Sequence, residues 1–234
     1  MTHSRRFVPP RWTLCLLFGL LLLFGCTAIE DIPEVPLGEE DLAQLRKTEE
    51  QMLQGYAPEV EIDRRISEAV RQMVDTLRPE YKQHSGEKHR VGFLEISDID
   101  RRTVTRFHTY ITEKTLTFSF LQPEIATNFN IVERFLLQDV LRELQLQNMR
   151  NPRIVDSELA KYLGHLYDVD LIETGVVTDG GDFVDVNLRM IETQRGRIVA
   201  VGSAKIEKTR MVRNWLRQRV GTEVGWPEPR RRRR

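Results

Sequence analysis

Cysteine is the scarcest chemistry-bearing residue in this chain, since only Cys15 and Cys26 occur among its 234 residues. A disulfide framework of the kind that cross-links small exported domains is therefore excluded. Cys15 lies inside an apolar run near the N-terminus, and Cys26 directly follows that run. The folded part of the chain has to be stabilised by the packing of apolar side chains.

The sequence also lacks the short motifs that mark common catalytic sites. It has no HExxH, no phosphate-binding loop, no GxGxxG and no GxSxG. Asp98-Ile99-Asp100 follows an apolar segment, a placement typical of aspartyl-phosphate phosphatases, in which one carboxylate attacks phosphorus and both help to hold magnesium. The alternative, which we favour, is that Asp98 or Asp100 caps the following helix.

Other acids and histidines offer only weak candidates. His165, Asp168 and Asp170 could be interpreted as a metal cluster, but polar residues are expected at the helix–strand junction that they flank. The segment 179–182 fits a two-residue turn better than the longer loop that calcium needs. We predict no catalytic residue, no metal site and no cofactor, and therefore a protein that is not an enzyme.

Long apolar runs are scarce as well. The most pronounced one, Leu14–Phe24, is about half of the roughly 20 residues that a membrane-spanning helix needs. Three arginines precede it, namely Arg5, Arg6 and Arg11. A charged stretch, then an apolar stretch, then a small residue is the layout of a secretory signal. An uncleaved membrane anchor is the alternative, which the shortness of the run disfavours.

The run ends in Leu23-Phe24-Gly25-Cys26, which resembles the processing site of bacterial lipoproteins, although a small residue is usual at the position of Phe24. We predict that residues 1–25 are a signal peptide and that the mature chain begins at Cys26. The thiol of Cys26 would carry diacylglycerol, and its amino group a fatty acyl chain such as palmitate. Thr27 follows the cysteine, which favours an outer-membrane lipoprotein facing the periplasm.

Charge is distributed unevenly along the chain. Removing residues 1–25 takes away three arginines and no acids, so the formal charge falls from 0 to −3. Residues 30–50 carry eight acids against Arg46 and Lys47, whereas residues 230–234 are all arginine. This pattern predicts a lipidated acidic tether over residues 26–57, with a weak helix at 41–53, and a disordered basic tail over residues 221–234. Nucleic acid is not an expected partner of an exported lipoprotein.

Residues 58–220 carry the patterning of one α/β domain. Apolar residues at three- and four-residue steps after Pro58 predict a helix that ends near Pro79. Segments 91–96 and 129–132 predict short strands, segment 137–144 a helical stripe, and Asp156 the cap of a further helix. Segment 103–121 is ambiguous: we favour a helix for its first half, while alternation over 116–120 also fits a strand.

The last third of the domain changes to a period of two. Segments 169–178, 184–190 and 198–206 predict three strands, and the turn at Asp179–Asp182 is a strong hairpin signal. The predicted fold class is α/β, with a mixed β-sheet, flanking helices, a final three-strand antiparallel meander and a C-terminal helix.

A set of short segments carries strand and turn motifs in a characteristic order: Val91–Asp98, Phe129–Arg134, Leu163-Gly164, Val169–Ile172, Gly175–Asp179 and Val186–Thr193. Together they resemble the domain shared by FlgO-type flagellar lipoproteins and the CsgG-like curli-assembly family, over roughly residues 90–207. These motifs specify turns and packing rather than chemistry.

The resemblance implies an outer-membrane lipoprotein whose periplasmic domain is a non-catalytic binding or assembly module, associated with the flagellum or another envelope machine. Its partners would be the membrane, through the lipid, and envelope or flagellar proteins. Two alternatives stay open: a CsgG-like homo-oligomeric secretion channel and an LpoB-like activator of peptidoglycan synthesis. A channel needs two amphipathic hairpins of about ten-residue strands, for which only residues 115–120 offer a candidate.

The C-terminal segment predicts a basic amphipathic helix. Trp215 belongs to its apolar stripe, and Arg213 and Arg217 flank that stripe. Such a helix can lie on an anionic membrane, so these three residues are candidates for contact with a membrane surface. The alternative, which we favour, is that the stripe packs on the domain and leaves the cations in water.

Overall fold

The computed structural model describes residues 37–82, 88–99, 103–135, 139 and 156–220. Its strands form one mixed sheet in the order β3-β1-β4-β5-β6, and β2 pairs with β4 beside β1. Pairing is parallel from β3 through β4 and antiparallel from β4 through β6. The sheet confirms the predicted fold class. The strands are β1 His89–Leu94, β2 Ser97–Asp98, β3 Phe129–Phe135, β4 Leu171–Asp179, β5 Phe183–Glu192 and β6 Arg197–Glu207.

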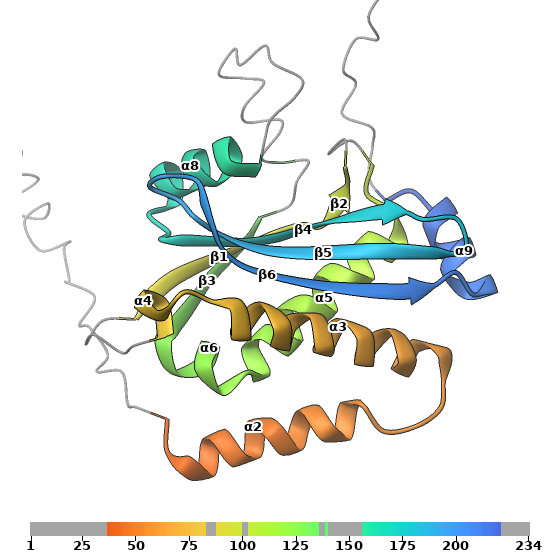
Figure 1. Ribbon diagram of the computed structural model, residues 1–234, viewed down its shortest axis with the longest axis horizontal. Coiled ribbons are helices and arrows are strands. Elements are labelled where there is room, and N and C mark those ends of the chain that lie inside the picture. The colour runs from red at the N-terminus through yellow and green to blue at the C-terminus, as the bar shows by residue number, and fades with distance from the viewer. Residues whose placement is uncertain (1–36, 83–87, 100–102, 136–138, 140–155, 221–234) are drawn as a thin grey trace, which may run out of the picture. The chain divides into compact units, whose positions relative to one another are not determined.

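Helices cover both faces of this sheet. Figure 1 shows α3, α5 and α6 on one face, α8 on the opposite face, and α2 outside α3. Two separate groups of buried apolar side chains correspond to these two faces. The described helices are α2 Glu39–Met52, α3 Pro58–Thr76, α4 Pro79–Lys82, α5 Arg106–Leu121, α6 Pro123–Asn128, α8 Asp156–Tyr167 and α9 Arg210–Arg217. None of the described helices is long and apolar enough to span a bilayer.

The predicted helix after Pro58 is confirmed as α3. Pro58 occupies its first turn, where the missing N–H costs nothing. The apolar stripe of α3 faces β6, and Ile66, Val70 and Met73 are fully buried there. At Gly202 of β6 an added Cβ would lie 1.9 Å from a backbone oxygen of α3. The small residues on this face of β6 therefore permit close contact between strand and helix.

The ambiguous segment 103–121 is helical to its end. α5 includes Thr115 and Phe120, so the strand alternative for this stretch is wrong. Side-chain hydroxyls accommodate the helix by donating to carbonyls one turn back, as Thr112 does to His108 and Thr117 to Glu113. The one segment that a channel could have used as a membrane strand is therefore a helix.

The prediction that Asp98 caps α5 is wrong. The N-cap is Thr105, whose backbone N–H donates to Nδ1 of His108 at 3.1 Å. The Asp98 carboxylate instead accepts the backbone N–H of Thr103 at 3.3 Å. Asp100, the other candidate for the cap, lies outside the described residues.

The predicted meander is confirmed. β4 and β5 are joined at Asp179–Asp182, where Gly181 takes a positive φ of 86° and donates its N–H to the Asp179 carboxylate. β5 alternates buried and half-buried residues, as a strand with one covered face does.

The folded unit begins earlier than residue 58. Among the described residues, those from Leu37 onward group into one unit, and the helix predicted at 41–53 is observed in it as α2. The signal peptide, Cys26 with its lipobox, the helical stripe at 137–144 and the basic tail lie outside the described residues, apart from residue 139.

Candidate interaction surface and a buried polar seam

The apolar stripe of α9 is turned into the domain. Thr209 caps the helix by accepting the backbone N–H of Val212, whose side chain is fully buried. Trp215 is half-buried against Tyr110 of α5, with their ring centroids 4.8 Å apart. The guanidinium of Arg106 lies 5.4 Å from the centre of the indole. The apolar stripe of α9 thus packs on the domain, as we favoured. Contact of Arg213, Trp215 and Arg217 with a membrane stays a prediction.

Two shallow grooves adjoin α9 and share Pro58 and Thr209. One, of about 480 Å³, is lined by residues of α9 that include Trp215. The other, of about 460 Å³, runs between the start of α3 and the ends of β5 and β6, where the Lys205 ammonium lies 4.0 Å from the centre of the Phe183 ring. We call the outer face of α9 and these two grooves the α9 surface.

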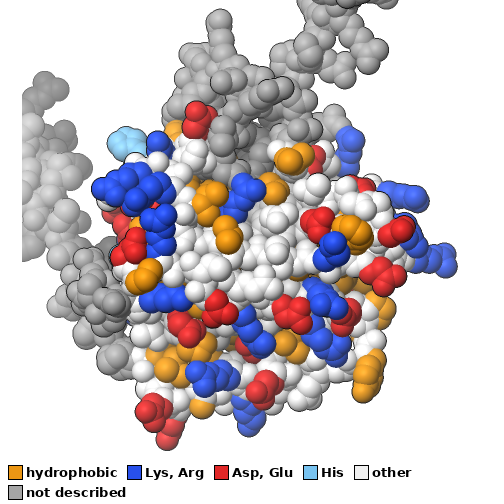
Figure 2. All heavy atoms as spheres, in the orientation of Figure 1, with side chains coloured by type: hydrophobic (Ala, Val, Ile, Leu, Met, Phe, Trp, Pro, Cys, Tyr) orange, Lys and Arg blue, Asp and Glu red, His pale blue; other side chains and the backbone are white. Residues whose placement is uncertain are grey.

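The outer face of α9 is basic. Arg210, Arg213 and Arg217 are exposed and form no ion pair with any residue that the structure describes. Figure 2 shows Lys and Arg side chains, with Asp and Glu side chains beside them, at the edge that corresponds to α9 in Figure 1. Unpaired cations raise the local potential and attract anionic groups. The geometry therefore suits a phosphate- or carboxylate-bearing surface.

A second feature, which sequence reasoning missed, is a row of polar side chains between α5 and the sheet. His108, Thr112, Thr115 and Ser119 follow helical spacing along α5, and all four are buried. Ser119 Oγ donates to Glu173 Oε1 of β4 at 2.8 Å. We call these five residues the polar seam. The signal that could have revealed it is the spacing of its α5 members, which places polar groups where an apolar stripe is expected.

The polar seam holds two groups with shifted pKa values. Burial raises the pKa of Glu173 to about 8, against the opposing effect of the hydrogen bond from Ser119, so this carboxyl is neutral at pH 7. Burial lowers the pKa of His108 to about 4, although nearby Asp98 acts in the opposite direction. Both groups are therefore uncharged at neutral pH.

Three buried polar atoms in the seam have no hydrogen-bond partner among the described residues, namely His108 Nε2, Thr115 Oγ1 and Glu173 Oε2. Since Nδ1 of His108 accepts the N–H of Thr105, its proton lies on Nε2. Unpaired buried polar groups cost free energy. The unpaired atoms of the polar seam therefore lower the stability of the contact between α5 and the sheet.

The weaker sequence candidates have structural roles. Asp168 takes a positive φ of 53° and pairs with Arg90 at 2.6 Å, while the Asp170 carboxylate accepts the backbone N–H of Arg90. The Asp179 carboxylate pairs with Lys208 and shapes the hairpin turn. Within the described ranges, no group of three or more His, Cys, Asp or Glu residues could hold a metal ion.

Comparison with known proteins gives a limited result. No family model matches the chain, and no curated protein matches its sequence. Among solved structures, the LpoB C-terminal domain from Salmonella enterica is 11% identical, covering 61% of this chain and 95% of that one, with a TM-score of 0.39. Lipoprotein GNA1162 from Neisseria meningitidis is 16% identical, covering 52% and 82%, with a TM-score of 0.30.

The LpoB C-terminal domain from Escherichia coli is also similar, at 10% identity, 61% and 98% coverage and a TM-score of 0.37. All three TM-scores lie below 0.5, so these likenesses assign neither a family nor a function to this chain.

Proposed function

We propose that this protein is a lipoprotein of the bacterial outer membrane, whose periplasmic domain is a non-catalytic binding or assembly module of an envelope machine, associated with the flagellum. The observation that carries the proposal is the order of two features. The lipoprotein-like site Leu23–Cys26 comes just before a folded unit that begins at Leu37. A lipidated Cys26 would therefore attach this domain to the membrane through a short linker.

The linker sets how far the domain stands from the lipid. Residues 27–36 separate Cys26 from Leu37, and about 3.5 Å per extended residue gives a maximum of about 35 Å. Pro33 and Pro36 stiffen this stretch. The domain is thereby held within reach of membrane-embedded or membrane-proximal parts of an envelope complex.

A second contact with the membrane fits the same arrangement. The several acyl chains expected on Cys26 suffice for stable attachment, so a basic patch would orient the domain on the membrane rather than anchor it. Arg213 and Arg217 present such a patch on the α9 surface, with Trp215 packed beneath it. We propose that these residues contact anionic headgroups once the lipid has brought the domain to the bilayer.

The non-catalytic part of the proposal is supported by the position of Asp98. A phosphatase nucleophile needs a carboxylate directed at the substrate, whereas this carboxylate accepts the N–H of Thr103 and shapes the loop before α5. A phosphatase would hydrolyse phosphate esters and lose that turnover in the Asp98→Asn variant with the fold intact. We expect the wild-type protein to hydrolyse no phosphate esters.

Lipidation is tested by replacing each cysteine in turn. We expect Cys26→Ser to abolish incorporation of labelled palmitate and to leave the protein as a precursor or in the soluble fraction. The matched control is Cys15→Ser, which should label and fractionate like the wild type because its thiol is removed with the signal. Normal labelling and membrane fractionation of Cys26→Ser would overturn the proposal.

A further inference from the structure

Helix α2 docks on the domain through a face whose centre is a carboxylate. Glu49 is the one side chain of α2 that is buried, at 5% exposure. The apolar residues around it, Leu45, Met52 and Leu53, are only partly buried against the core. α3, by contrast, buries Ile66 completely. The docking of α2 therefore combines apolar contacts that stay partly exposed with a buried carboxylate at their centre.

Polar contacts of Glu49 add to these apolar contacts. Its carboxylate accepts hydrogen bonds from Ser67 Oγ of α3 and from Gln122 Nε2, the latter at 3.4 Å. Its Oε1 also pairs with the guanidinium of Arg71 at 3.0 Å. Ser67 and Gln122 are themselves buried. A buried carboxylate is tolerated only while such partners are in place, so α2 is held by one polar cluster.

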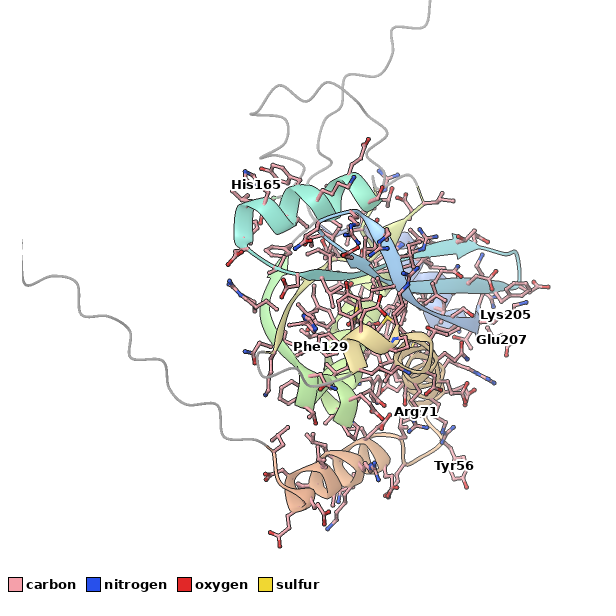
Figure 3. The ribbon with its side chains drawn as sticks, turned by 60° about the vertical axis from the view of Figure 1, so that its left-hand side comes forward. Tyr56, Arg71, Phe129, His165, Lys205 and Glu207 are labelled. Carbon is pink, nitrogen blue, oxygen red and sulfur yellow. The ribbon has the colours of Figure 1, made fainter. Side chains whose placement is uncertain are left out.

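The link between α2 and α3 has the features of a hinge. Gly55 takes a positive φ of 109°, which favours glycine. Arg64 of α3 donates to the backbone oxygens of Leu53 and Gly55, at 3.4 and 2.6 Å. Tyr56, in the same link, is fully exposed and points away from the domain (Figure 3). Arg64 thus ties the C-cap of α2 and Gly55 to α3, so a pivot at Gly55 requires these two hydrogen bonds to break.

We propose that α2 is a releasable clasp that sets the reach of the domain from the membrane. The proposal rests on the lipid anchor at Cys26. With α2 docked, residues 27–36 span at most about 35 Å. With α2 released but still helical, its 14 residues add about 21 Å, and residues 27–38 and 53–57 bring the total to about 80 Å. Release more than doubles the distance at which the domain can engage a partner.

Release needs less free energy than unfolding of the domain. Elements with little buried apolar surface open locally, while strands of the core exchange only on global unfolding. Because the apolar side chains of α2 stay partly exposed, we place α2 lower in that range than β4–β6, whose inward side chains are fully buried. Tension on the lipid end, or a partner that binds Ser67 and Arg71 once release has uncovered them, would favour the released state.

Amide hydrogen exchange of the full chain in detergent tests the clasp without any assumption about its lipid. In the wild type, α2 should exchange at least tenfold faster than β4–β6. Glu49→Ala should accelerate exchange in α2 at least tenfold further and leave β4–β6 unchanged. The matched control is Glu50→Ala, which removes an exposed carboxylate from the same helix and should change nothing. Equal protection of α2 and β4–β6 in the wild type would overturn the clasp, as would acceleration of every element together by Glu49→Ala.

Reach is measured on lipidated protein in vesicles. A donor dye is attached at Glu207→Cys, an exposed position on β6, in a Cys15→Ser background, and the vesicles are made of zwitterionic lipid with acceptor lipids, so that the basic face of α9 is not engaged. Glu49→Ala should lower energy transfer relative to Glu50→Ala. Equal transfer in two vesicle-bound variants would overturn the clasp. If neither variant binds vesicles, the lipid anchor fails instead, and hydrogen exchange still decides whether α2 is released.

Discussion

At the scale of single residues, the most consequential feature is the neutral acid in the polar seam. The folded-state pKa of Glu173 lies at about 8, above the value of 4.5 for the free side chain. Between these pH values the native state binds more protons than the unfolded state. The stability contributed by the protonated carboxyl is therefore complete below pH 4.5 and is lost as pH rises through 8.

We predict that Glu173→Gln removes this loss of stability. The amide keeps the shape of the protonated acid and can still accept the hydrogen bond of Ser119. Near pH 8 the variant should exceed the wild type in free energy of unfolding by on the order of 3 kcal/mol, and the difference should shrink towards pH 5. Urea denaturation at several pH values measures it.

The control for this experiment is Glu207→Gln, which neutralises an exposed carboxylate on β6. It should leave the pH profile of the wild type unchanged.

The pKa of His108 is lowered to about 4, so its stabilisation is present above pH 6.5 and is lost as pH falls towards 4. The Glu173 effect is therefore read most cleanly between pH 6.5 and 9. A parallel pH profile for Glu173→Gln and wild type would refute the prediction.

The residues of the polar seam also show where sequence reasoning ends. The stripe of α3 could be predicted because its apolar positions recur at helical spacing, and burial follows from that spacing. On α5 the same spacing is occupied by His108, Thr112, Thr115 and Ser119. Their burial depends on the facing strand β4, which is distant in sequence, so no local pattern could identify the partner Glu173.

At the scale of elements, the meander and α3 could be predicted from period and turn chemistry, whereas the docking of α2 could not. An acidic segment with few apolar residues indicates a tether. Its helix is retained on the domain by Glu49, whose partners come from α3 and from the residue after α5. A single polar cluster of this kind has no signature in sequence spacing.

The outer face of helix α9 presents Arg213 and Arg217 to solvent. Reversing its two outer charges with Arg213→Glu and Arg217→Glu should reduce binding of the domain to vesicles of anionic lipid at least tenfold, because both cations lie on one exposed helix face. The packing of Val212 and Trp215 beneath them is unaffected by the change. Sedimentation with vesicles measures the binding.

A matched pair of reversals at Lys161 of α8 and Arg195, both to glutamate, changes the net charge by the same amount on exposed residues elsewhere. This control should retain more vesicle binding than the α9 variant. Equal loss in both variants would mean that only total charge matters, and unchanged binding in the α9 variant would exclude α9 as a membrane contact.

At the scale of the whole molecule, the question is whether copies assemble with one another or with different proteins. An exposed strand edge is the usual route by which copies pair. At the β6 edge, Thr76 Oγ1 accepts the N–H of Val201 and donates to its carbonyl, and Gln72 accepts the N–H of Ser203. Side chains of α3 therefore occupy the outward backbone groups of Val201 and the N–H of Ser203 in the middle of this edge, which an added strand would need.

We expect the detergent-extracted, lipidated protein to have the native mass of a monomer, alone or joined to a different envelope protein after mild cross-linking in cells. The physical reasons are the occupied β6 edge and the helical state of residues 115–120, the segment that a secretion channel would have to turn into a membrane strand. Light scattering and identification of the cross-linked species decide the point. A discrete ring of identical subunits would favour the channel over the assembly module, whereas a cross-linked partner would identify the machine to which the module belongs.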